Sequence, residues 1–151
     1  MTEFTTRPEI LGTFGVVTST HWIASSVGMA ILEKGGNAFD AAVATGFVLQ
    51  IVEPHLCGPG GDMPAVFYSK KKDKVEVICA QGPAPSGATI EHYTSEGLKL
   101  IPGDGLLATV IPGAFDGWML MLRDYGTMSV REVLEPAIYY AEYGHPTLPR
   151  V

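Results

Sequence analysis

The stretch GGNAFDAAVATGFVLQIVEP, residues 35–54, decides the fold of this chain. Asn37 is a favourable helix N-cap, and Asp40 places negative charge in the first turn, where it suits the helix dipole. Alanines and a glycine put small side chains on every face of the segment before Pro54 ends it. A helix this smooth is typical of one with neighbours packed close on all sides. We therefore expect a buried helix over residues 38–53.

The preceding residues predict a strand followed by another helix. Residues 14–19, FGVVTS, have the composition of a short strand. Ser19 or Thr20 then caps a helix that Gly35 terminates. One apolar stripe follows this helix at every fourth residue, at Ile23, Val27 and Ile31.

Residues 58–61, GPGG, have the composition of a loop that cradles phosphate. Such loops follow a strand and open a helix, so that free N–H groups face the anion. Here a helical pattern enters the loop and a β-like run leaves it, and Asp62 would repel phosphate. The sequence therefore argues against a nucleotide site.

Farther along, two β-like runs, residues 65–69 and 74–80, flank the segment KKKDK, which indicates a solvated hairpin turn. Two later helices, AFDGWMLMLRDY and SVREVLEPAIYYAEY, are each closed by a glycine. Ser129 and Glu132 form a capping box for the second of them. Pro136 should kink or break that helix.

The remaining segments predict loops. Residues 82–89 form an extended, proline-punctuated loop, residues 95–105 a surface excursion, and residues 108–113 a short strand or loop. The fold class is therefore α/β (α+β), with helices on a sheet that contains a hairpin.

Composition narrows the classes of function. The 151 residues suffice for about one domain, and 46% apolar with 17% charged residues is typical of a globular protein. The net charge is −6 and the basic residues are scattered, which argues against nucleic-acid or anionic-membrane partners. Because no secretory signal or membrane-spanning stretch is visible, we expect a cytoplasmic protein in which Cys57 and Cys79 are reduced thiols.

Several segments, taken in order, resemble the gamma-glutamyltransferase family: GVVTSTHWIAS, GMAILEKGGNAFDAAVAT, VEPHLCGPGGDM, APSGAT, VIPGAFDGW and YGTMSVREVLEPAIYYAEYG. The resemblance implies an N-terminal-nucleophile hydrolase with an αββα sandwich, made as a precursor that cuts itself. It also implies that residues 1–151 are the N-terminal segment of a large subunit, which is an incomplete domain.

The resemblance also bears on the glycines of residues 58–61. The family has a Gly-rich segment here, before a core strand. Two explanations stay open: the backbone passes closely between a helix layer and the sheet, or the glycines contact substrate. Asp62 stands in place of a further family glycine, which suggests a distinct branch.

The family's nucleophile is the N-terminal threonine of the small subunit, which uses its own α-amine as base. No catalytic residue is therefore expected in this chain, which alone should be inactive. The histidines have no metal-ligand spacing, and we expect neither a metal nor a cofactor. The four are His21, His55, His92 and His145.

Gln81 is the candidate substrate-binding residue. Family members have arginine and then glutamate at this point, and the arginine forks onto the α-carboxylate of the glutamyl group, whereas this chain has Gln81 and Gly82. Glutamine lacks the charge and the rigid fork. Acylase-like relatives that hydrolyse glutaryl-type amides have less need of such a clamp. The alternative is that Gln81 is only a loop residue.

The intact protein is therefore expected to transfer or hydrolyse a gamma-glutamyl or glutaryl-type acyl group. Its partners would be a small-molecule amide and the small subunit from the same precursor, with a homodimer of the processed protein left open. Two alternatives remain: a cephalosporin-acylase-type hydrolase without transpeptidase activity, and a non-catalytic paralogue that serves as a binding or structural subunit.

Overall fold

The computed structural model describes residues 9–147. The prediction that the N-terminus carries no secretory signal falls partly on residues 1–8, which lie outside the described residues. The elements, in chain order, are α1 (Trp22–Glu33), α2 (Ala38–Val52), β1 (Met63–Ser69), β2 (Lys74–Ala80), α3 (Ile90–Ser95), a 3-10 helix (Leu106–Ala108), α4 (Ala114–Tyr125) and α5 (Val130–Tyr143). Within this range no helix combines the length and the hydropathy that crossing a membrane requires.

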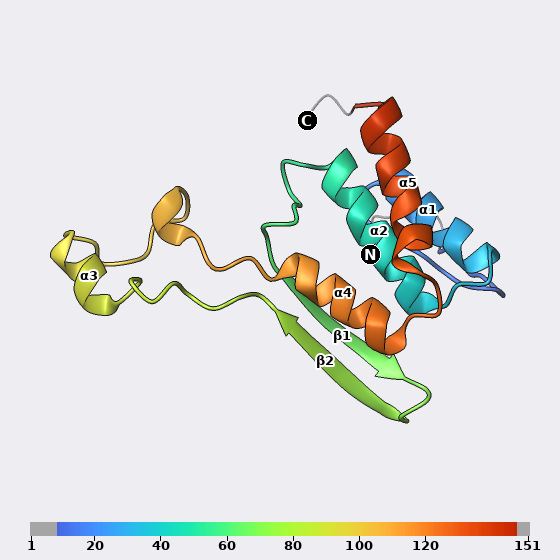
Figure 1. Ribbon diagram of the computed structural model, residues 1–151, viewed down its shortest axis with the longest axis horizontal. Helices are drawn as coiled ribbons and strands as arrows, with labels where there is room; N and C mark the ends of the chain where they lie inside the picture. Colours follow the sequence, from blue (N-terminus) through green and yellow to red (C-terminus); the bar gives the residue numbers. More distant parts are fainter. Residues whose placement is uncertain (1–8, 148–151) are drawn as a thin grey trace, which may run out of the picture.

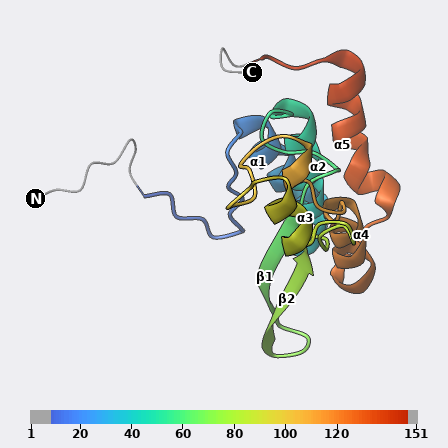
Figure 2. The same ribbon diagram turned by 90° about the vertical axis from the view of Figure 1, so that its left-hand side faces the viewer.

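Helices α1, α2, α4 and α5 lie on one side of the β1–β2 hairpin. In Figures 1 and 2, α1, α2 and α5 occupy one end of the body and the hairpin occupies the other. Helix α2 packs against α1, α4 and α5, while α4 also packs against both strands. The predicted class, helices on a sheet that contains a hairpin, is confirmed.

Helix α2 is the buried helix that the sequence predicts. The Asn37 Oδ1 accepts hydrogen bonds from the N–H groups of Phe39 (2.8 Å) and Asp40 (3.0 Å). The Asn37 N–H donates in return to the Asp40 carboxylate at 2.8 Å, which completes a capping box. Small residues let neighbouring helices approach, among them the buried Ala41, Ala44 and Gly46.

Asp40 does more than the predicted favourable contact with the helix dipole. It is fully buried and accepts hydrogen bonds from the Thr127 N–H (2.9 Å), the Thr127 hydroxyl (2.6 Å) and the Met128 N–H (3.1 Å). Burial acts to raise the pKa of this carboxyl, but the hydrogen bonds outweigh it and hold the pKa below 3.8. The carboxylate therefore ties the start of α2 to the turn between α4 and α5.

The predicted hairpin is present, with Met63 opposite Ala80. Its inner face packs so closely on α4 that a Cβ added to Gly117 would lie 2.3 Å from the Ala80 Cβ. The outer face is exposed and apolar. It consists of three cross-strand pairs, Pro64 with Cys79, Val66 with Val77 and Tyr68 with Val75.

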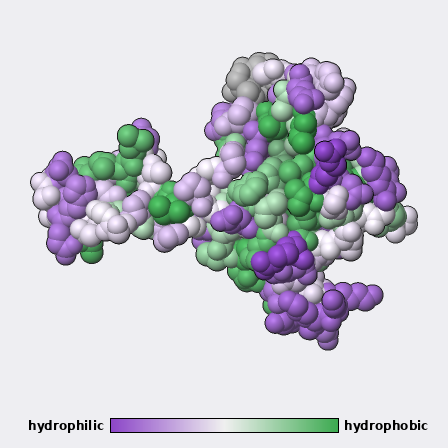
Figure 3. Space-filling model, in the orientation of Figure 1, coloured by the Kyte–Doolittle hydropathy of each residue, from purple (hydrophilic) through white to green (hydrophobic). Residues whose placement is uncertain are grey.

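The lysine-rich turn of the hairpin is solvated, as predicted, and forms a hydrophilic tip in Figure 3. Lys72 is the lysine in this turn that contacts the body. Its Nζ lies 3.1 Å from the Glu76 carboxylate and 3.0 Å from the Tyr125 hydroxyl.

Two predictions near the N-terminus are wrong. Residues 14–19 are not a strand, because no described segment pairs with their backbone. His21, and not Ser19 or Thr20, caps α1, its ring Nδ1 accepting from the Ile23 N–H at 3.2 Å. The two expected caps are engaged elsewhere, since the Ser19 hydroxyl donates to the His21 carbonyl and the Thr20 hydroxyl to the Glu53 carboxylate.

The C-terminal helix pair is confirmed, including the Ser129–Glu132 capping box. Helix α5 does not break at Pro136. Pro136 has no N–H group and cannot donate the usual backbone hydrogen bond of the helix. The buried Val133 and Ala137 lie on either side of it in the chain, and their packing compensates for the lost bond. Residues 108–113 are loop, and α3 is a short helix that the sequence analysis did not expect.

Candidate functional site

Three loops meet where the hairpin opens, at the start of β1 and the end of β2. The Gly61 carbonyl accepts hydrogen bonds from the N–H groups of Gly113 (3.1 Å) and Ala114 (3.0 Å). The Ile111 N–H donates to the Pro83 carbonyl at 3.0 Å. The Gly-rich loop, the segment after β2 and the segment before α4 are thus joined by backbone contacts.

Gly82 fixes the shape of this junction. Its φ of +72° lies in the left-handed region, which favours glycine. A Cβ added there would lie 1.7 Å from the Ile111 carbonyl oxygen. The position therefore accepts no side chain in this backbone conformation. The glutamate that family members have at this point would have no room here.

Gln81 lies at the mouth of the junction and is exposed. Its Oε1 accepts a hydrogen bond from the Cys79 thiol at 3.4 Å, while its amide N–H groups have no partner within residues 9–147. A cavity of about 600 Å³ lies beside it, lined in part by Gly82, Pro83 and Arg123. The Arg123 guanidinium is paired with Asp124, at 2.6 and 3.0 Å. Gln81 itself is not among the residues that line this cavity, and its role in binding substrate stays a prediction.

The explanation of the glycines by close packing has no support at Gly58 and Gly60 within residues 9–147. No described atom lies within 4 Å of a Cβ added at either position. Gly61 acts through its carbonyl, which receives the first N–H groups of α4. Contact with substrate stays a prediction for the two open glycines.

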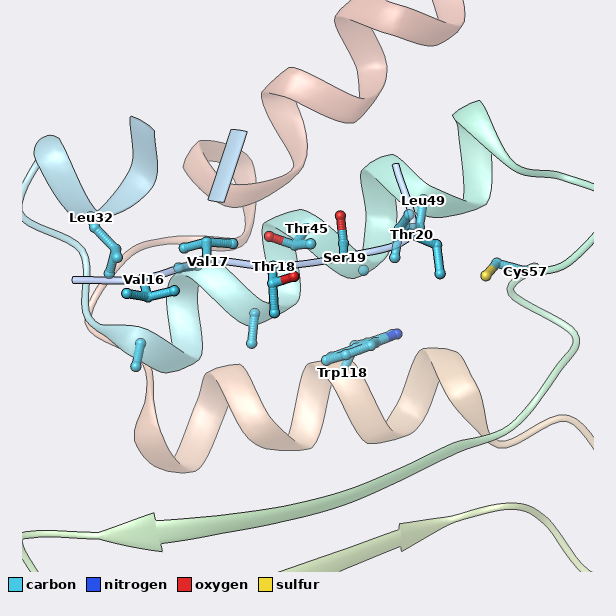
Figure 4. A pocket seen from close by; sticks show the side chains of 14 residues that line it. Val16, Val17, Thr18, Ser19, Thr20, Leu32, Thr45, Leu49, Cys57 and Trp118 are labelled. Carbon is cyan, nitrogen blue, oxygen red and sulfur yellow. The ribbon is translucent and has the colours of Figure 1, made fainter. Parts of the chain in front are cut away.

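A second cavity, of about 660 Å³, lies between residues 16–20, α2 and Trp118 (Figure 4). Cys57 lines it, and burial, together with the nearby Glu53 carboxylate, raises the pKa of this thiol. A raised pKa keeps the thiol protonated and makes it a poor nucleophile. Both cysteines are free. No local signal in the sequence predicts this cavity, because two of its walls come from segments about a hundred residues apart.

The histidines form no site within the described range. His21 is buried as a helix cap, and residues 9–147 contain no cluster of three or more side chains suited to hold a metal ion.

The mixed helix-and-sheet arrangement is that of the N-terminal-nucleophile hydrolases of known structure. More narrowly, the chain belongs to the gamma-glutamyltranspeptidase family, whose match covers residues 24–151. This confirms the resemblance drawn from the sequence segments.

Two relatives show the extent of the similarity. The chain is 41% identical over 138 residues to the glutathione hydrolase-like YwrD proenzyme of Bacillus subtilis (strain 168), covering 91% of this chain and 26% of that protein. It is 36% identical over 151 residues to the acylase ACY 1 proenzyme of Pseudomonas sp. (strain SE83), covering 91% of this chain and 26% of that protein. The chain thus spans about a quarter of the length of the curated relatives it matches.

Solved structures support the same family membership. The structure of LmbA2991HD superposes with a TM-score of 0.89 at 55% identity, covering 99% of this chain and 26% of that one. The gamma-glutamyltranspeptidase of Helicobacter pylori superposes with a TM-score of 0.82 at 35% identity, covering 91% of this chain and 40% of that one.

Proposed function

We propose that this chain is the N-terminal part of the large subunit of a gamma-glutamyltransferase-like amidohydrolase or acylase. The family match over residues 24–151 carries the proposal. The matched relatives are named proenzymes, which supports a precursor that is cut into two subunits. The intact enzyme would act through the N-terminal threonine of the small subunit.

In this mechanism the threonine hydroxyl attacks the amide carbonyl, and its own α-amine takes the hydroxyl proton. The C–N bond then breaks, the leaving amine takes up the proton, and the acyl group remains as an ester on the threonine. Water releases the acid, or a second amine takes the acyl group. Backbone N–H groups would stabilise the oxyanion of each tetrahedral intermediate.

Two unpaired or uncovered surfaces of this chain support the existence of a longer precursor that packs against them. The outer face of the hairpin is apolar on all three cross-strand pairs, as in strands buried on both sides. Residues 14–19 have a strand-like sequence with no partner in the described range. A two-stranded sheet is at best marginally stable without further packing. The rest of the precursor would cover both surfaces.

The role proposed for this chain in catalysis is recognition of the acyl end by Gln81. Its amide offers neutral donors, whereas an arginine would hold a carboxylate through two charge-assisted hydrogen bonds. Gly82 leaves no room for a carboxylate that could orient such an arginine. These two features favour, as a second candidate, an acylase-type hydrolase without transpeptidase activity, in line with the similarity to acylase ACY 1.

The test is kcat/KM of the complete, processed protein for a gamma-glutamyl and a glutaryl anilide. The wild type should discriminate weakly between them. Gln81→Arg should raise kcat/KM for both, since both carry the distal carboxylate, and the gain should shrink with added salt. If Gln81→Arg and Gln81→Ala both leave the two values unchanged, Gln81 is only a loop residue.

A further inference from the structure

The feature that the proposed function does not use is an arm, residues 84–110, that extends from the junction of loops (Figure 1). Its base is held by the Ile111–Pro83 hydrogen bond and by the close approach of Gly82 to Ile111. Its tip contains α3 and the 3-10 helix, which are tied together by the Tyr93 hydroxyl donating to the Leu107 carbonyl at 2.8 Å. The arm therefore has a defined local structure.

The arm carries large apolar side chains that touch nothing in the body. The exposed fractions of Ile90, Leu100 and Leu106 are 82%, 85% and 93%. Figure 3 shows hydrophobic areas at the surface of the arm among polar ones. A small groove of about 190 Å³ lies at the tip and includes Ile90 and Leu100 among its lining residues. So many exposed aliphatic side chains mark a surface that is covered by protein.

The occupant is indicated by the structural comparison. A superposition that covers 99% of this chain with a TM-score of 0.89 requires the arm to match as well as the body. The matched protein is a single chain of which this one spans about a quarter. The arm thus holds, in isolation, the position that it has in a much longer chain. A segment of the same longer chain is therefore the simplest partner to pack against the apolar surface of the arm.

We infer that the arm clasps the remainder of its own precursor and buries Ile90, Leu100 and Leu106 there. This inference rests on the proposed function in one respect, the existence of a longer precursor. It adds that the contact is made by a projecting segment, so that the large subunit holds the rest of the precursor from two directions, the hairpin and the arm.

Limited trypsin digestion of the complete precursor tests this inference. Lys99 is the sole lysine or arginine between Lys74 and Arg123, so that a tryptic cut there reports on the arm alone. The wild-type precursor should resist cutting at Lys99. Leu106→Asp should accelerate that cut by about ten-fold or more, because cleavage follows the population of the open form. Lys71→Asp, an exposed change in the hairpin turn, should leave the rate at Lys99 unchanged.

Two results would overturn the inference. One is a wild-type precursor cut at Lys99 as fast as the Leu106→Asp variant. The other is protection that disappears on dilution together with a change from dimer to monomer, which would make a second copy the occupant. Self-cutting of the precursor is read from the same gels. A precursor that cuts itself while Lys99 stays open refutes the arm contact and leaves the proposed function standing.

Discussion

Replacing Asp40 by alanine should destabilise the complete protein more than other changes of one carboxylate. The substitution removes the buried acceptor of the part-buried N–H groups of Asn37, Thr127 and Met128. Each unsatisfied buried donor costs about 1–3 kcal/mol. Since some of them will recover a water, we expect a loss of about 3–5 kcal/mol in the free energy of unfolding, a large part of a typical total.

The assay is urea unfolding of the complete precursor, with Asp124→Ala as the matched control. Asp124 is an acidic residue on the surface of α4, and its loss should leave the unfolding midpoint unchanged. Equal midpoints for Asp40→Ala and Asp124→Ala would refute the assignment of Asp40 as the link between α2 and the α4–α5 turn.

The pH dependence of this effect has a definite sign. The hydrogen bonds lower the pKa of Asp40 in the folded protein, so its contribution to stability is present above the unfolded pKa of about 3.9. That contribution is lost as the pH falls through the folded pKa. The difference in stability between the wild type and Asp40→Asn should therefore be constant near neutral pH, begin to change as the pH falls to the unfolded pKa, and reach its acid limit only below the lower folded pKa.

Four further substitutions test the packing and the junction, each by its unfolding midpoint. Asn37→Ala should cost about 2 kcal/mol, because it removes both the helix cap and the hydrogen bond to the Tyr125 carbonyl. Ala44→Leu should cost about 1–3 kcal/mol by overpacking, whereas Ala42→Leu faces cavities and should cost less. Gly82→Ala should cost at least about 2 kcal/mol, because of its positive φ and the Ile111 carbonyl, and equal stability of this variant and the wild type would contradict that geometry.

Local signals in the sequence predicted local structure well. The Asn37 cap, the Ser129–Glu132 capping box and the hairpin were all predictable, because each depends on residues close together in the chain. The partners of Asp40 lie 87 and 88 residues away and leave no local signal. Residues 14–19 failed as a strand for a related reason, since strand propensity is realised only when a second strand supplies hydrogen bonds.

The candidate site was predictable only in part. The family resemblance singled out Gln81 and Gly82, but the positive φ of Gly82 and its approach to Ile111 depend on a loop about thirty residues farther on. The cavity beside Cys57 and the arm likewise depend on how distant segments are placed. The location of the protein in the cell, its oligomeric state and the role of Gln81 stay predictions.

The central claim is that this chain begins the large subunit of a precursor that cuts itself. The most direct test is the intact mass of the complete protein after purification and incubation. We expect two fragments, with residues 1–151 in the larger one and a threonine at the new N-terminus of the smaller one, and a gamma-glutamyl or glutaryl substrate should add its acyl mass to that smaller fragment. A single uncut chain that never carries the acyl group would contradict the account and favour a non-catalytic paralogue.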